Sequence, residues 1–229
     1  MERPLQRWHV DDILNEIRSA EREKRPADLT YKLLPEFSFF DKTIEASLDF
    51  EGSTIQGAIY FHNCKIKGDL IFKNVLIYTT LYLDKNTIEG DFVGEGLKLR
   101  EVFNCIASHF KKNLSLKNAQ IRGFLGLNRI FVANDLILDG LIVKNLKSRT
   151  GIIKGDIYLE NAKIMGNVLI RRAFFEGLGN FKNTEIRGNL NLSGTMFQEI
   201  VELSGTIIEG ETLTKDFRCE NLIAKIEQI

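Results

Sequence analysis

The feature that most constrains the fold is an 11-residue repeat that runs from residue 37 to residue 211. Each unit reads apolar, x, apolar, x, x, small, x, apolar, x, Gly, x. The last apolar slot holds an apolar residue in every unit, at Ile44, Ile55, Ile66, Ile77, Ile88, Leu99, Phe110, Ile121, Val132, Val143, Ile153, Ile164, Phe175, Ile186, Phe197 and Ile208. A short period kept over many units is typical of a solenoid, in which each unit packs only against its neighbours.

Within each unit the inward residues come in pairs two positions apart. This spacing predicts short β-strands, because alternate residues of a strand share a face. The residue before the small slot is often Gly or Asn, as at Gly52 and Asn63, and a second Gly such as Gly57 follows the last apolar slot. These residue types adopt turn conformations readily. Each unit therefore supplies two strands and two corners.

Eleven residues would enclose too little space for the large side chains at the inward slots, so we expect two units per coil. The predicted fold class is an all-β solenoid, a right-handed quadrilateral β-helix with about 22 residues per coil, about eight coils and short helical caps at both termini. Residues 1–36 are expected to form the N-terminal helical cap, residues 37–211 the β-helix of sixteen 11-residue units, and residues 212–229 the C-terminal helical cap.

The two caps are predicted from helical stripes of apolar residues. Ile13, Leu14 and Ile17 lie on one stripe near the N-terminus. The C-terminal stripe consists of Cys219, Leu222, Ile223 and Ile226. Such helices would cover the strand edges that an open solenoid exposes at its ends. Dimerisation or partner binding through these helices is the alternative interpretation.

One irregularity interrupts the period between Leu136 and Gly155, where the pattern is one position shorter than two full units. We interpret it as a single-residue slip, after which the repeat continues at Leu146. Four basic residues gather there, namely Lys144, Lys147, Arg149 and Lys154. A solvated corner accounts for them, and a contact for an anion or phosphate is the functional alternative.

Composition limits the classes of partner. The 31 basic and 31 acidic residues give a formal charge of zero, which provides no global attraction to nucleic acid or anionic membrane. Cys64 and Cys105 fall in inward slots and are expected to be small core residues in a reducing compartment. No apolar run approaches the roughly 18 residues of a spanning helix, and residues 1–9 lack the apolar region of a secretory signal. We therefore expect a cytoplasmic protein without a membrane span.

The repeat unit is nearly intact in three segments: LSLKNAQIRG at residues 114–123, IYLENAKIMG at residues 157–166 and LNLSGTMF at residues 190–197. This unit resembles pentapeptide-repeat-like β-helix proteins, in particular relatives with an 11-residue beat. The resemblance covers about residues 37–211. It implies a right-handed quadrilateral β-helix that is not an enzyme and acts through its surface.

Residues 22 apart are expected to stack on one side of the solenoid, and one such ladder is acidic. It consists of Asp69, Asp91, Asn113, Asp135 and, across the slip, Asp156. Capping of corner amides by these side chains is the structural interpretation. The alternative is a metal site, a weak Ca²⁺ site at Asp69, Asp91, Asp135 and Asp156, because stacked carboxylates repel unless a cation intervenes. A second, structural ladder is expected at Asn145, Asn167 and Asn189.

Two outward apolar pairs suggest a surface for a protein partner. Tyr60 and Tyr82 are expected to stack on one face, and Ile71 and Val93 on another.

His9, His62 and His109 share no spacing that fits a metal site, and the GxSxG, P-loop and HExxH motifs do not occur. We therefore assign no catalytic residue and no cofactor.

The function predicted is that of a non-enzymatic β-helix serving as a rigid scaffold for an unidentified protein partner. It includes self-association into a homo-oligomer through the terminal caps or an apolar flank. The first alternative is a module that holds a cation, glycan or nucleic acid on the Asp ladder or the basic corner, although the neutral net charge argues against nucleic acid. The second is a polysaccharide-acting enzyme, which would need a cleft with two acids about 5–10 Å apart.

Overall fold

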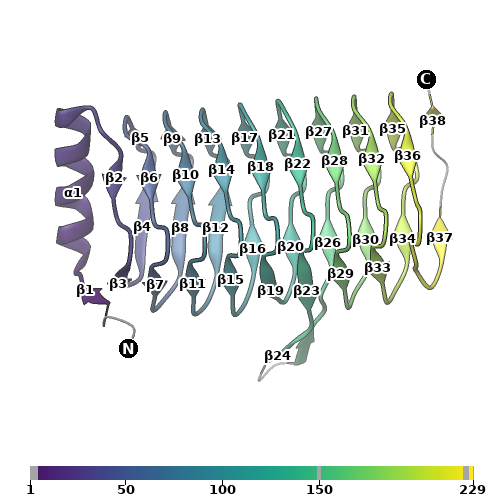
Figure 1. Cartoon of the computed structure of the whole chain (residues 1–229), viewed down its shortest axis with the longest axis horizontal. Coiled ribbons are helices and arrows are strands. Elements are labelled where there is room, and N and C mark those ends of the chain that lie inside the picture. Colours follow the sequence, from purple (N-terminus) through teal and green to yellow (C-terminus); the bar gives the residue numbers. More distant parts are fainter. Residues whose placement is uncertain (1–4, 149–150, 224–226, 229) are drawn as a thin grey trace.

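The computed structural model describes residues 5–148, 151–223 and 227–228, and its body is a four-sided solenoid of stacked coils (Figure 1). The same slot recurs 22 positions later on the next coil, as in the pairing of Leu70 with Phe92. Successive strands of a coil belong to four different parallel sheets, which we name A, B, C and D. The predicted all-β solenoid and the predicted length of its coil are confirmed; its right-handed winding stays a prediction.

Each sheet contains nine described strands. Sheet A consists of β1 (Gln6–Arg7), β3 (Lys32–Leu34), β7 (Thr54–Ile55), β11 (Leu76–Ile77), β15 (Lys98–Leu99), β19 (Gln120–Arg122), β23 (Ile142–Lys144), β29 (Phe174–Phe175) and β33 (Met196–Phe197). Sheet B consists of β2 (Ala27–Asp28), β6 (Leu48–Asp49), β10 (Leu70–Ile71), β14 (Phe92–Val93), β18 (Leu114–Ser115), β22 (Leu136–Ile137), β28 (Val168–Leu169), β32 (Leu190–Asn191) and β36 (Thr212–Leu213).

The other two sheets complete the coil. Sheet C consists of β4 (Phe37–Phe40), β8 (Ile59–His62), β12 (Leu81–Asp84), β16 (Phe103–Asn104), β20 (Leu125–Gly126), β26 (Ile157–Tyr158), β30 (Gly179–Asn180), β34 (Val201–Glu202) and β37 (Leu222–Ile223). Sheet D consists of β5 (Thr43–Ile44), β9 (Lys65–Ile66), β13 (Thr87–Ile88), β17 (His109–Phe110), β21 (Phe131–Val132), β27 (Lys163–Ile164), β31 (Glu185–Ile186), β35 (Ile207–Ile208) and β38 (Glu227–Gln228). The stack is longer than the eight coils predicted, because strands on both sides of residues 37–211 join the sheets.

The core is a set of side-chain columns that run along the solenoid axis. Phe50 and Phe72 stack with ring centroids 4.8 Å apart and planes inclined by 2°. Phe175 and Phe197 stack in the same way at 4.4 Å. Because identical slots of adjacent coils are held about 4.8 Å apart by the strand ladders, aromatic residues in one slot are brought directly into stacking contact.

At the small position of the repeat unit, buried threonine side chains form hydrogen bonds to the backbone. Thr184 Oγ1 donates to the carbonyl of Leu159 at 2.6 Å, and Thr206 Oγ1 donates to that of Phe181 at 2.7 Å. Both threonines are fully buried. These hydroxyl groups bind carbonyls of the preceding coil that face the interior, where an unpaired carbonyl would be destabilising.

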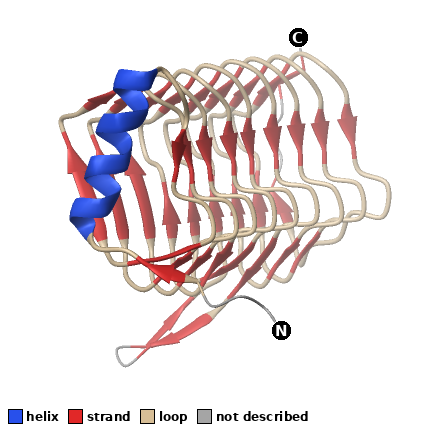
Figure 2. Ribbon diagram, turned by 60° about the vertical axis from the view of Figure 1, so that its left-hand side comes forward, coloured by secondary structure: helices blue, strands red, loops and turns tan. Residues whose placement is uncertain are grey.

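The irregularity after Leu136 is an inserted hairpin rather than a slip. Strands β24 (Leu146–Ser148) and β25 (Gly151–Ile153) pair antiparallel and project from the body (Figures 1 and 2). Consequently Leu136 pairs with Val168, although Tyr158 stands at the usual spacing from it. Leu146 and Ile153 therefore belong to the hairpin and not to the parallel sheets, and one of the sixteen predicted units is this hairpin.

One helix, α1 (Val10–Glu23), occurs in the described part of the chain, and it covers the N-terminal end of the solenoid (Figure 2). Ile13, Ile17 and Ala20 are its buried residues. The N-terminal helix is confirmed. The C-terminal helical cap is wrong, since β36 and β37 lie there and continue the parallel sheets.

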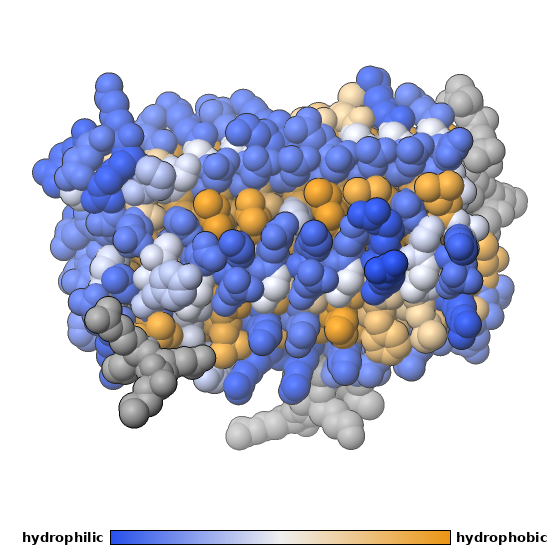
Figure 3. Space-filling view, viewed as in Figure 1, coloured by the Kyte–Doolittle hydropathy of each residue, from blue (hydrophilic) through white to orange (hydrophobic). Residues whose placement is uncertain are grey.

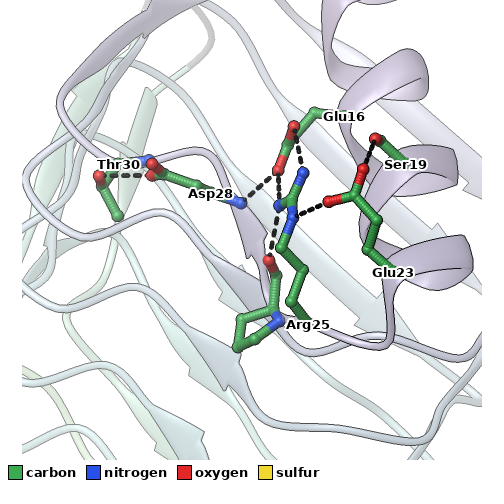
Figure 4. Close-up of polar contacts among 7 residues, drawn as sticks. Glu16, Ser19, Glu23, Arg25, Asp28 and Thr30 are labelled. Atoms are coloured by element: carbon green, nitrogen blue, oxygen red, sulfur yellow. Dashed lines mark hydrogen bonds and ion pairs between the residues drawn. The ribbon is translucent and has the colours of Figure 1, made fainter.

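Helix α1 is fixed to the first coils by carboxylate groups (Figure 4). Glu16 binds the Arg25 guanidinium and also accepts the Asp28 backbone N–H at 2.9 Å. The hydrogen bond from Arg25 is the main reason that the pKa of Glu16 is lowered. Glu21 accepts the Glu45 N–H at 2.9 Å. Because Asp28 and Glu45 lie in or next to the first strands of their sheets, the helix occupies edge donors that would otherwise be open to pairing.

Candidate functional site

The Asx ladder predicted at one corner exists and extends further than expected. The Oδ1 of Asp69 accepts the Asp91 backbone N–H at 2.8 Å, and the Oδ1 of Asp91 accepts that of Asn113 at 3.0 Å. The acceptors of the ladder are Ser47, Asp69, Asp91, Asn113, Asp135, Asn167 and Asn189. Each side chain thus satisfies a corner amide of the next coil, which matches the structural interpretation.

Two of the predicted ladder positions were wrong. Asp156 lies at another corner, where its Oδ1 accepts the Leu178 N–H at 2.8 Å and its Oδ2 accepts the Tyr158 hydroxyl at 2.7 Å. Asn145 does not begin a second ladder but binds the Gly155 N–H at the base of the hairpin. Both errors follow from the hairpin. Every residue after it lies on a different sheet or corner from the one predicted by a single-residue slip.

Among the residues that the structure describes, no group of three or more His, Cys, Asp or Glu side chains could hold a metal ion. In the ladder itself, the Oδ1 of Asp69, Asp91 and Asp135 is already occupied by backbone N–H groups. Calcium binding by these residues stays an untested prediction.

The structure describes the side chains of two members of the predicted basic cluster, Lys144 and Lys154, and an anion contact there stays a prediction. Lys154 forms an ion pair with Glu199 at 2.7 Å. Lys144 is exposed at the end of β23, while Lys147 lies in β24 and Arg149 lies outside the described residues. Lys144 is exposed and forms no ion pair with another described residue.

The aromatic pair on sheet C has the predicted geometry. Tyr60 and Tyr82 stack with centroids 5.1 Å apart and planes inclined by 9°. Burial raises the pKa of the Tyr82 hydroxyl. The next two coils place Asn104 and Gly126 in this row, so the aromatic surface ends after two residues.

The second apolar pair belongs to a longer row on the outer face of sheet B. The strand register aligns Ile71, Val93, Ser115, Ile137, Leu169, Asn191 and Leu213 on successive coils. Figure 3 shows orange residues at intervals along a line that follows the solenoid, with blue bands on either side. Leu213 is 40% exposed, and the other aliphatic members are partly exposed. Five of the seven members are aliphatic, interrupted by Ser115 and Asn191. Exposed apolar side chains that gather on one face are typical of a contact surface.

A row of charges runs beside the aliphatic row, two positions further along the chain, in the turn that follows each strand of sheet B. Its members are Glu51, Lys73, Glu95, Lys117, Asp139, Arg171, Ser193 and Lys215. Acid and base alternate over the first six positions. Lys73 pairs with Glu51 at 3.2 Å, and Arg171 pairs with Asp139. A hollow of about 420 Å³ lies in the middle of the row, lined by Lys117, Asp139, Arg171 and Ser193 among others.

Comparison with known proteins adds one similar structure. No family model and no curated protein matches the sequence. The chain is similar to the crystal structure of HetL, a pentapeptide repeat protein involved in heterocyst differentiation regulation from the cyanobacterium Nostoc sp. strain PCC 7120. The identity is 16%, the match covers 92% of this chain and 94% of HetL, and the TM-score is 0.26. The β-solenoid assignment rests on the strand register above.

No helix in the described residues is both long and apolar enough to span a bilayer.

Proposed function

We propose that this protein is a non-enzymatic scaffold that associates through the outer face of sheet B, and that the occupant of this face is a second copy of the chain. The observation that carries the proposal is the self-complementarity of the charge row on this face, which runs beside the aliphatic row. Both rows run along the solenoid axis, so a second copy can meet them over several coils at once.

Consider two copies placed face to face and related by a two-fold axis that lies in the interface, perpendicular to the solenoid axis. Such an axis reverses the order of the coils and leaves each row opposite the same row of the partner. With the axis between the coils of Lys117 and Asp139, these two residues face each other across the interface. The neighbouring positions then bring Glu95 opposite Arg171, and the outermost positions bring Glu51 opposite Lys215.

Three of the four opposing positions in the charge row therefore join opposite charges, and the fourth joins Lys73 to Ser193. In the aliphatic row, the same axis places Val93 opposite Leu169, whereas Ile137 faces Ser115 and Ile71 faces Asn191. Charge complementarity favours this register and penalises others, because a shift by one coil in an alternating row brings like charges together. The face thus specifies an antiparallel arrangement as well as a contact.

The test is the dependence of solution mass on protein concentration, measured by light scattering. We expect the wild-type chain to shift from monomer to dimer as concentration rises over about a hundredfold, and the Val93→Glu variant to stay monomeric. The matched control is Ile207→Glu, a partly exposed aliphatic residue on sheet D, which should dimerise as the wild type does. A wild-type chain that is monomeric throughout, or a Val93→Glu variant that still dimerises, contradicts the proposal.

A further inference from the structure

The outer face of sheet A differs in its charge pattern from that of sheet D. On sheet D, Lys67 pairs with Glu45 at 2.7 Å and Lys111 with Glu89 at 2.7 Å, so cations alternate with anions from coil to coil. On sheet A, by contrast, Arg100, Arg122 and Lys144 occupy one row on three successive coils. None of the three forms an ion pair with another described residue.

These cations line a groove of about 650 Å³. Lys98 stands beside Arg100 in the neighbouring row and is also exposed, whereas the aliphatic Leu76 and Ile142 form the groove at its two ends. Coils about 4.8 Å apart hold the like charges close together, and side chains of equal sign at this spacing repel. A bound anion that runs along the solenoid axis would remove this repulsion.

The row also begins with an aromatic ring. Tyr78 is 39% exposed, and the Arg100 guanidinium lies 4.1 Å from its ring centroid. At the other end, Lys144 is the last residue of β23, after which the chain leaves the body to form the β24–β25 hairpin (Figure 1). The run of cations ends there, because the strand register places Glu176 next in the row. A row of cations that ends in an exposed aromatic ring combines the two elements that bind single strands, namely charges that follow the phosphates and a platform on which a base stacks.

We infer that the sheet A groove binds single-stranded nucleic acid, with Lys98, Arg100, Arg122 and Lys144 contacting phosphates and Tyr78 stacking on a base. The zero net charge of the chain does not oppose this, because several cations elsewhere are compensated locally by the ion pairs described above. The groove lies on a different sheet from the proposed dimer face. The Val93→Glu variant should therefore bind as the wild type does, so failure of one proposal is distinguishable from failure of the other.

The experiment is a fluorescence polarisation titration of the full chain with a labelled oligothymidylate of about 15 nucleotides at low salt, where phosphate contacts are strongest. Four cationic contacts predict that log affinity falls against log salt with a slope of about −3. We expect Arg122→Gln to weaken binding by about tenfold and Tyr78→Ala to weaken it by a similar factor. Lys111→Gln is the matched control, since this exposed lysine on sheet D is paired with Glu89; it should change affinity less than about twofold.

Three results would overturn the inference. The first is absence of binding at low salt in a wild-type sample whose circular dichroism and melting show the folded state. The second is an equal loss of affinity in Lys111→Gln and Arg122→Gln, which indicates non-specific attraction. The third is binding of a polyglutamate peptide or of duplex DNA more tightly than the single strand, with no effect of Tyr78→Ala.

Discussion

Mixing two single variants of the sheet B face, Glu95→Lys and Arg171→Glu, is expected to produce a dimer that neither variant forms alone. In the antiparallel arrangement, residue 95 of each protomer faces residue 171 of the other. A homodimer of either variant therefore brings like charges together at two places. The mixed dimer restores opposite charges at both places, because one pair is reversed and the other is native.

The expected size of the effect follows from exposed ion pairs, which contribute about 0.5 kcal/mol each. Two pairs that change from attraction to repulsion weaken each homodimer by about 2 kcal/mol, or roughly thirtyfold in dissociation constant. The measurement is sedimentation velocity of each variant and of the equimolar mixture. Since Arg171 also pairs with Asp139 within the chain, thermal melting of both variants is the control for folding. A mixture that sediments as the average of the two single variants argues against this register.

The second large effect concerns the core. Phe72→Ala is expected to lower the free energy of unfolding by about 3–5 kcal/mol. Phe72 is fully buried between Phe50 at 4.8 Å and Phe92 at 5.9 Å, and hydrogen-bonded strands fix the backbone on both sides. The coils cannot approach to fill the resulting cavity, because their spacing is set by the ladders.

Chemical denaturation with circular dichroism measures this change, and Phe40→Ala is the matched control. Phe40 is 54% exposed on sheet C, so its removal should alter stability by less than about 1 kcal/mol. Equal destabilisation by the two substitutions would show that the stacked columns are not the main source of stability in this region.

The repeat predicted the body of the fold well because each strand pair and each corner reflects a local requirement. Inward pairs such as Ile59 and Phe61 are buried, and corner residues such as Asn63 and Asn74 adopt the left-handed conformation that Asn tolerates. Gly96 has the same conformation, with φ of +66°. Because the same pattern recurs on every coil, the length of the coil was well determined.

The hairpin was missed because its sequence resembles a unit. Leu146 and Ile153 are separated by the same seven positions as the first and last apolar slots, and the insertion is one position shorter than a unit. The pattern alone cannot distinguish such an insertion from a slip. The C-terminal helix failed for a related reason, since Leu222 and Ile223 fit a helical stripe but pair with β34 in the structure.

Because the hairpin was interpreted as a slip, the full length of the aliphatic row on sheet B was not predicted. Ile71 and Val93 were identified, but Leu169 follows Ile137 in their row only when the hairpin is removed from the count. The sheet A row had a signal that could have been found, because Tyr78, Arg100, Arg122 and Lys144 recur at the spacing of one coil. The row was not predicted because its cations lie 22 residues apart and form no basic cluster in the sequence.

The most direct test of the antiparallel dimer is a distance between spin labels placed at Lys215→Cys in each protomer, with Cys64, Cys105 and Cys219 replaced by Ser. In the proposed dimer, Lys215 of each protomer faces Glu51 of the other. Within one protomer, Lys215 and Glu51 lie seven coils apart. Seven intervals of about 4.8 Å and a face-to-face separation of about 10 Å predict a label distance of about 35 Å. A distance of about 10–15 Å would indicate a parallel dimer, and the absence of any dipolar interaction at dimer-forming concentration would show that the sheet B face is not the contact.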